Sequence, residues 1–143
     1  MKYLRIVVLS IMAAASLNLM GCAEQPMHEG KEKVIFQVSD ADPKKWNLTL
    51  NNIKNVQHDI GKDNVDIEIV AYGPGISMLK LDSEVGNRVE EAAATGVKVM
   101  ACGNTMTGLK LTKDDMLPNI GYVKAGVVEL MQKQHEGYAI IRP

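Results

Sequence analysis

The stretch VKVMACGNTMTG, residues 97–108, decides the fold class. Its first half is an apolar run that ends in Cys102 and is typical of a buried strand. Gly103, Asn104 and Thr105 follow at once, and residues of these types begin turns and helices. A buried strand that passes directly into a helix start is typical of α/β proteins, in which strands and helices alternate.

The same alternation extends in both directions along the chain. Apolar, β-branched runs predict strands over residues 33–39, 65–72, 97–102, 120–123 and 138–143. Apolar residues at steps of three and four, or helix-start residues, predict helical segments over residues 43–60, 83–96, 111–118 and 125–136. This order predicts a mostly parallel five-stranded sheet with helices on both faces, which is a three-layer αβα sandwich.

Several residues mark where the predicted helices begin and end. Asp42 and Pro43 are typical of an N-cap and a first helical position. Gly61 is typical of the residue that ends a helix. Thr112 and Asp115 resemble a capping box, although Asp is shorter than the usual Glu.

Residues 1–21 have the features of a secretory signal peptide. A basic start, MKYLR, precedes the apolar stretch IVVLSIMAAASLNL. The residues LMGC at 19–22 resemble the lipobox of bacterial lipoproteins, in which the cysteine is acylated and becomes the first mature residue. The alternative is an ordinary signal peptide that has a cysteine at this place by chance.

A lipidated Cys22 implies an exported protein that is held on the periplasmic side by acyl chains and not by a membrane-spanning helix. Ala23, which is not Asp, favours the outer membrane. Residues 22–32 are then the lipidated cysteine and a polar, flexible tether, and residues 33–143 are one domain.

The charge of the mature chain argues against nucleic acid as a partner. Without residues 1–21 the chain has 122 residues, with 14 basic and 17 acidic side chains. Nucleic-acid-binding domains have a basic patch and often aromatic residues that stack on bases. Here the balance is weakly acidic and the aromatic residues are few. We therefore expect no nucleic-acid partner.

Cys102 is the one cysteine left if Cys22 carries lipid. It has no partner for a disulfide within its own chain, in a compartment where thiols tend to be oxidised. One interpretation is a buried core residue, because free cysteines are among the most buried residues. The other is a reactive thiolate, because a helix start lowers a thiol pKa from about 8.5 towards 7 or below. Its place at the carboxyl end of a strand favours the second interpretation.

Ligands of open α/β sheets bind beyond the carboxyl ends of the strands. Three predicted loops lie there: SDADP after the first strand, YGPG after the second and CGNT after the third. Their glycines allow close approach of the backbone, and their polar residues can cap helices. The predicted pocket around Cys102 is made of Asp40, Tyr72, Gly73, Gly75, Gly103, Asn104 and Thr105.

Other kinds of site have little support in the sequence. The chain has no phosphate-binding loop and no GxGxxG motif, so no nucleotide cofactor is expected. His28, His58 and His135 are far apart and show no metal-ligand spacing, so no metal site is expected. The methionines of the mature domain suggest a copper site, but Met100, Met116 and Met131 lie on apolar faces and are expected in the core.

Three motifs together resemble the DsrE/DsrF-like family: VAYGPGISML, MACGNTMTGLKLTKDDMLP and AGVVELMQKQHEGYAIIRP. The resemblance extends over residues 33–143. It implies a flavodoxin-like fold with a central five-stranded parallel sheet, and homo-oligomers that are commonly trimers or hexamers. In the sulfur-handling members a cysteine carries sulfur as a persulfide and passes it along a relay. Cys102 lies where that cysteine is found.

Two classes of function remain open at this point. In the first, the Cys102 thiolate accepts or transfers sulfane sulfur, with a donor or acceptor protein as partner. In the second, the protein is a non-catalytic oligomeric module that binds a small ligand or a metal. Cys102 would then be structural, or would sense redox conditions by forming an intermolecular disulfide.

Overall fold

The computed structural model describes residues 30–143, and the predicted signal peptide and Cys22 lie outside these residues. The strands are β1 (Glu32–Val38), β2 (Val65–Ala71), β3 (Lys98–Cys102), β4 (Gly121–Val123) and β5 (Ala139–Ile141). They form one sheet in the order β4-β3-β2-β1-β5, and every neighbouring pair is parallel. The predicted five-stranded parallel sheet is therefore confirmed.

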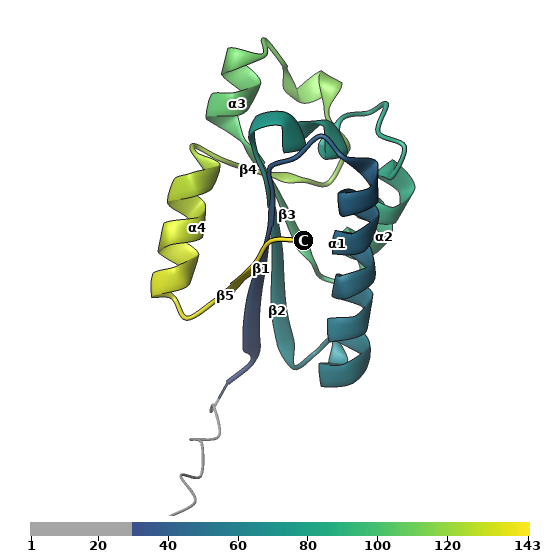
Figure 1. The fold of residues 1–143 in the computed structure, drawn as a ribbon, viewed down its shortest axis with the longest axis vertical. Coiled ribbons are helices and arrows are strands. Elements are labelled where there is room, and N and C mark those ends of the chain that lie inside the picture. Colours follow the sequence, from purple (N-terminus) through teal and green to yellow (C-terminus); the bar gives the residue numbers. More distant parts are fainter. Residues whose placement is uncertain (1–29) are drawn as a thin grey trace, which may run out of the picture.

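Helices cover both faces of this sheet, as the sequence predicts (Figure 1). The long helices are α1 (Pro43–Val56), α2 (Gly86–Ala94) and α4 (Gly126–His135), and the short helix α3 (Gly103–Gly108) follows β3. In Figure 1, α1 and α2 lie on one side of the sheet, α4 lies on the other, and α3 lies beyond the strand ends. The predicted three-layer sandwich is confirmed.

Each face of the sheet has its own core. Trp46, Leu50 and Ile53 of α1 pack with Val89 of α2 and one face of the strands in the larger core. The smaller core lies under α4 and is made of Ile35, Val70, Leu130 and Tyr138. All five strands of the sheet and both cores lie within residues 32–143, so these residues form one folded unit.

The predicted start of α1 is confirmed, whereas the α-helix ends earlier than predicted, at Val56. The Asp42 side chain accepts a hydrogen bond from the Lys44 N–H at 2.9 Å, and Pro43 is the first helical residue. After Val56 the helix widens into one π-helical turn, η1 (Gln57–Gly61). Gly61 has a φ of +92°, which is the left-handed conformation that favours glycine where a helix ends.

The segment over residues 111–118 is not the helix that its start residues predict. Thr112 and Asp115 do form a capping box, but it begins only a single 3₁₀ turn, η3 (Lys113–Asp115). The chain then turns away, because the Leu117 N–H donates to the Leu79 carbonyl at 2.9 Å. A second 3₁₀ segment, η2 (Gly73–Leu79), supplies that carbonyl. Long-range backbone pairing therefore replaces the helix.

The outer side of α4 is apolar. Leu130 faces the sheet and is buried, but Val127, Val128 and Met131 are 53 %, 45 % and 59 % exposed. The expectation that Met131 lies in the core is therefore wrong. The physical reason is that nothing within residues 30–143 packs on the side of α4 that faces away from the sheet (Figure 1).

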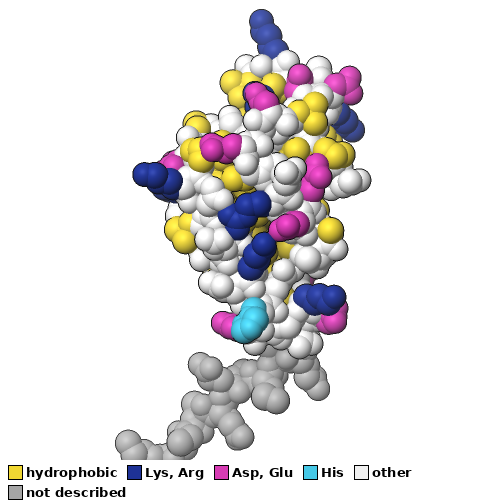
Figure 2. Space-filling model, turned by 90° about the vertical axis from the view of Figure 1, so that its right-hand side faces the viewer, with side chains coloured by type: hydrophobic (Ala, Val, Ile, Leu, Met, Phe, Trp, Pro, Cys, Tyr) yellow, Lys and Arg dark blue, Asp and Glu magenta, His cyan; other side chains and the backbone are white. Residues whose placement is uncertain are grey.

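The face that carries α1 has charges of both signs. Figure 2 shows Lys and Arg side chains beside Asp and Glu side chains over this face, with apolar atoms between them. Lys54 of α1, for example, pairs with Glu91 of α2 at 3.0 Å. None of the helices in residues 30–143 has the length and apolar character needed to cross a membrane.

Candidate active site around Cys102

The connections that follow β3 and β4 leave the carboxyl ends of these strands toward opposite faces of the sheet. The segment after β3 packs on the larger core through Met106, Met116 and Leu117, whereas the segment after β4 leads to α4 on the opposite face. In α/β proteins, ligands commonly bind beyond the carboxyl ends of neighbouring strands whose connections diverge in this way. Cys102, the last residue of β3, lies at this point.

Cys102 lies at the start of two helices. It is the N-cap residue of α3, and its Sγ accepts a hydrogen bond from the Gly126 N–H, the first residue of α4, at 3.3 Å. A helix start carries unpaired N–H groups and a partial positive charge, so both helices favour a negative sulfur. Of the two, α4 is the longer, with 10 residues against 6 in α3.

The pKa of the Cys102 thiol is lowered by this setting. Burial acts in the opposite direction and is the largest single influence, because it disfavours a charged sulfur. It is outweighed by hydrogen bonding from the Thr105 hydroxyl and from the N–H groups of Gly126, Thr105 and Asn104. The net effect favours the thiolate, which is the nucleophilic form of cysteine.

Thr105 connects the loops that follow β2 and β3. Its hydroxyl oxygen accepts a hydrogen bond from the Gly73 N–H at 2.9 Å, which leaves the hydroxyl proton free to point at the Cys102 sulfur. Gly73 has a φ of +53°, so its left-handed turn aims this N–H at Thr105. The hydroxyl that lowers the thiol pKa is therefore held by a contact between Gly73 and Thr105, which are 32 positions apart.

Gly126 is part of the site, although sequence reasoning missed it. A Cβ at this position would lie 2.9 Å from the Cβ of Tyr72, so only glycine brings the start of α4 this close to the end of β2. The Tyr72 hydroxyl accepts a hydrogen bond from the Gln37 side chain of β1, which fixes the ring against α4. Gly126, at the second position of the helical pattern predicted over residues 125–136, was the available signal.

The structure brings most of the predicted pocket residues together. Gly73 and Thr105 are joined by a hydrogen bond, and Tyr72 packs beside Gly126. A Cβ on Gly103 would lie 3.2 Å from the Val123 carbonyl oxygen, so this glycine lets the end of β3 lie close to β4. The exposed Asn104 donates its N–H to the Lys124 carbonyl at 3.0 Å.

Two predicted pocket residues have other roles. Asp40 follows β1 and pairs with Lys45 at 2.8 Å and with Arg142 at 3.4 Å, and these cations lower the pKa of its carboxyl. Gly75 is buried against the end of β1, where its Cβ would lie 2.3 Å from the Val38 carbonyl oxygen. Neither residue contacts the Cys102 sulfur through a hydrogen bond in the described structure.

The Cys102 thiol is buried, although it lies at the carboxyl end of its strand. Cys102 is 4 % exposed, so the strand end does not present it openly to solvent. The residues over it are the start of α4 and the short helix α3, of which only Met106 is buried. The sulfur is therefore largely shielded from solvent.

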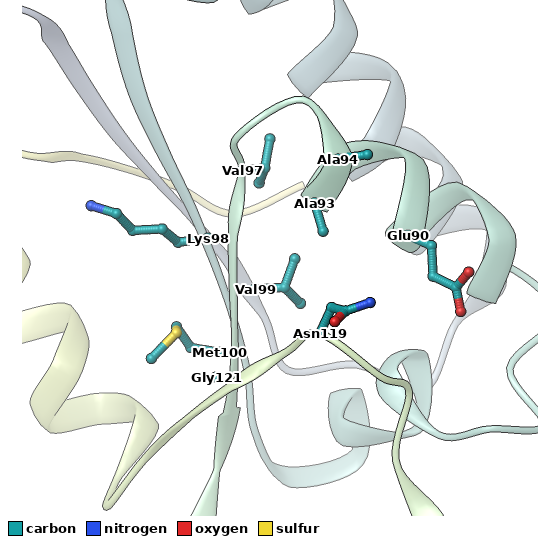
Figure 3. Close-up of a pocket in the computed structure, with 9 residues that line it drawn as sticks. All are labelled: Glu90, Ala93, Ala94, Val97, Lys98, Val99, Met100, Asn119 and Gly121. Carbon is teal, nitrogen blue, oxygen red and sulfur yellow. The ribbon is translucent and has the colours of Figure 1, made fainter.

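A hollow of about 440 Å³ lies at the opposite end of β3 (Figure 3). It opens because β4 begins at Gly121, opposite Met100, and the first part of β3 therefore has no neighbouring strand on the β4 side. Val97, Val99 and Ala93 line it, with Glu90 and Asn119 at its rim. It is not connected with the Cys102 site, and no group of His, Cys, Asp and Glu suited to a metal ion occurs within residues 30–143.

The Thr105 contact can be tested by its effect on thiol reactivity. We expect Thr105→Val to raise the pKa of Cys102 and to slow its alkylation by iodoacetamide several-fold near pH 7.5, because the hydroxyl that stabilises the thiolate is removed. Thr105→Ser keeps the hydroxyl and is the matched control. The same pH profile for the Val and Ser variants would contradict the role of this hydrogen bond.

Comparisons with known proteins agree with this architecture. The model of the family described as the DsrE/DsrF-like family matches residues 32–143. A solved protein of unknown function, MTH1491 from Methanobacterium thermoautotrophicum, is 34 % identical, with a TM-score of 0.75 over 79 % of this chain and 100 % of that one. None of the curated proteins matches the chain.

Two more distant structures share the fold. BT1422 from Bacteroides thetaiotaomicron is 16 % identical, with a TM-score of 0.63 over 78 % of this chain and 95 % of that one. The ychN protein from E. coli is 14 % identical, with a TM-score of 0.61 over 79 % of this chain and 99 % of that one. At this identity the likeness concerns the fold alone.

Proposed function

Because the chain belongs to the DsrE/DsrF-like family, we propose that the Cys102 thiolate accepts sulfane sulfur as a persulfide and passes it to an acceptor. The observation that carries this proposal is the hydrogen bond from the first N–H of α4 to the Cys102 sulfur. It places the thiol where a negative sulfur is stabilised, at the strand ends where α/β proteins bind their substrates.

The proposed step needs no external oxidant. The Cys102 thiolate attacks the outer sulfur of a donor persulfide, R–S–SH, and a new S–S bond forms on Cys102. The S–S bond of the donor breaks, and its electron pair leaves with the donor thiolate, R–S⁻. Attack by an acceptor thiolate on the outer sulfur of the loaded protein reverses these roles and restores the Cys102 thiolate. The Gly126 N–H and the Thr105 hydroxyl stabilise that leaving thiolate.

The burial of Cys102 is consistent with a sulfur carrier, because it protects a persulfide on Cys102 from reaction with other thiols. A persulfide on an exposed cysteine would exchange with any thiol that meets it. At 4 % exposure, exchange requires that α3 or the start of α4 moves, and a docked donor or acceptor protein can supply that movement. We therefore propose a sulfur donor or acceptor protein as the partner.

Transfer can be tested with cyanide, which removes the outer sulfur of a persulfide as thiocyanate. After loading with polysulfide and removal of the donor, we expect close to one thiocyanate per chain. Cys102→Ser should release none. Thr107→Ser, which keeps the hydroxyl that donates to the Gly103 carbonyl in the same helix, should behave as the unchanged protein. Equal release by Cys102→Ser would contradict the proposal.

A structural role for Cys102 is the second candidate, and its low exposure favours it. The protein would then be a small-ligand-binding module. In that case Cys102→Ala lowers the free energy of unfolding by roughly 1 kcal/mol, because it creates a small cavity, and it leaves ligand binding intact. Alkylation separates the two candidates, because a core cysteine reacts only as fast as the protein unfolds.

We also propose that the protein assembles as a homo-oligomer, a trimer or a hexamer. The apolar side chains on the outer side of α4 and on the edge strand β5 support this, because solvent-exposed surfaces of this kind usually mark contacts. They are Val127, Val128, Met131, Ile140 and Ile141. Light scattering should give a multiple of the chain mass that falls in Met131→Glu, and a monomeric mass at micromolar concentration would argue against assembly.

We further propose that the protein is exported and held on the periplasmic side, in the outer membrane, through a lipidated Cys22. The lipobox-like residues 19–22 support this. The membrane fraction should contain a chain that begins at Cys22 with acyl chains attached, whereas Cys22→Ala should lose them. An unmodified chain that still carries residues 1–21 would contradict export.

A further inference from the structure

A buried carboxyl group lies between the sheet and α4. Glu68 of β2 is 2 % exposed, and its side chain points to the face that α4 covers. Its Oε1 has no hydrogen-bond partner within the described residues, and its Oε2 lies 3.9 Å from Nζ of Lys133 in α4. A buried carboxylate with an unpaired oxygen is costly, so this arrangement requires an explanation.

The cation at this place is shared by three carboxyl groups. Lys133 lies 3.9 Å from Glu68, 3.8 Å from Glu129 and 2.9 Å from Glu136. One positive charge cannot neutralise three negative ones, so ionisation of all three leaves an excess of negative charge under the helix. A proton shared between the Glu68 and Glu129 carboxyls reduces that excess by one charge.

The remaining groups around Glu68 do not supply a second close cation. The charged and titratable groups that face this cluster from the packed elements are Lys33 of β1, Asp66 of β2, Lys98 of β3, Glu129, Lys133 and Glu136 of α4, and Tyr138. Lys98 pairs with Asp66 at 3.0 Å, and the Tyr138 hydroxyl donates to Asp66 at 2.6 Å. Lys33 donates to the Glu136 carbonyl at 3.0 Å.

These surroundings keep Glu68 protonated at acidic to neutral pH. Burial is the largest cause, and the Glu129 carboxyl, through its charge and a hydrogen bond between the two groups, adds to it. Lys133 and Lys98 act in the opposite direction, and the pKa of Glu68 is raised to about 7. The proton is therefore present below neutral pH and is lost above it.

The same helix connects this cluster with Cys102. The Gly126 N–H that contacts the thiol is the first residue of α4, and Lys133 lies about two turns further along. Leu130 packs between these points in the smaller core, together with Val70 of β2. A helix moves largely as one body, so a change in how α4 packs on the sheet at Glu68 also changes the position of its first residue at the thiol.

We propose that Glu68, sharing a proton with Glu129, is a positioning residue that holds α4 on the sheet and thereby keeps the Gly126 N–H on the Cys102 sulfur. When the proton leaves, two facing carboxylates under one lysine repel each other, and α4 opens more often. The thiol then loses its donor and its cover. The consequence for sulfur transfer rests on the proposed function, but the opening itself does not.

Hydrogen exchange of the full chain tests the opening without any sulfur donor. After correction for intrinsic rates, exchange in peptides that contain the start of α4 should become about tenfold faster between pH 6 and pH 8.5. In Glu68→Gln, which cannot lose a proton, the corrected rate should not change with pH. Glu90→Gln on α2, on the other face of the sheet, is the matched control and should behave as the unchanged protein.

The Glu129→Gln variant provides an independent check if Glu68→Gln does not fold. It removes the second carboxylate while Glu68 stays in place, and it should also reduce the pH dependence of exchange. Iodoacetamide labelling of Cys102 at pH 8.5 should be slower in both variants than in the unchanged protein. The proposal is overturned if the folded variants keep the pH dependence of the unchanged protein, whatever the outcome of sulfur loading.

Discussion

Glu68→Gln is expected to raise the free energy of unfolding at pH 8 by about 3 kcal/mol and to change it little at pH 4. The carboxyl has a pKa of about 7 in the folded protein, against an ordinary value of 4.5. The folded state therefore prefers the protonated form. Its stabilising contribution is complete below the ordinary pKa and is lost as the pH rises towards 7.

Denaturant unfolding of residues 23–143 at several pH values measures this effect. The difference between the variant and the unchanged protein isolates Glu68, because the other carboxyls titrate in both. Gln keeps the shape of the side chain and can still donate a hydrogen bond to Glu129, as the protonated carboxyl does. A constant difference between pH 4 and pH 8 would contradict a titrating carboxyl under α4.

Gly75→Ala is expected to destabilise the protein by about 3 kcal/mol or more, the upper range for overpacking of a buried site. The added Cβ would lie 2.3 Å from the Val38 carbonyl oxygen and 2.9 Å from the Ser39 Cα. Both are backbone atoms at the end of β1 and cannot rotate away. The η2 segment would therefore have to shift, although Gly75 has no contact with the thiol.

Gly108→Ala is the control for this substitution. Gly108 is the last residue of α3, and a Cβ there would meet no atom within 4 Å. Because Ala is a better helix former than Gly, the free energy of unfolding should stay the same or rise slightly. Thermal unfolding of the two variants measures both effects, and equal stabilities would contradict the packing role of Gly75.

The fold could be predicted from the sequence because its strands are apolar runs bounded by strong turn and cap residues. Asp42 and Pro43 fix the start of α1, and Gly61 ends the π-helical turn that follows it. The segment over residues 111–118 could not be predicted in this way, since its capping box is real but the pairing of Leu117 with Leu79 overrides it. Such pairing depends on parts of the chain that are distant in sequence.

The candidate site could be predicted only in part, for the same reason. Cys102 and Thr105 are neighbours in sequence, so their proximity could be expected. The Gly126 contact joins residues 24 positions apart and depends on the strand order, which the sequence pattern does not determine. Asp40 also follows a strand, but its pairing with Lys45 and Arg142 at the end of β1 separates it from the site.

Glu68 had no distinguishing signal in the sequence. It alternates with apolar residues in VDIEIVAY, which is the pattern of a strand with one polar face. Here the polar positions lie on the face that α4 covers, so Glu68 is buried and Asp66 is half-buried, and both need partners. Only the placement of α4 over this face shows that Glu68 is buried.

The most direct test of the central claim is the intact mass of residues 23–143 after incubation with a polysulfide. This part of the chain holds all five strands and has Cys102 as its only cysteine. We expect the mass to rise by one sulfur atom, a thiol reductant to remove the added mass, and Cys102→Ser to show no increase. An unchanged mass in the folded protein would make Cys102 a core residue and would contradict a role as sulfur carrier.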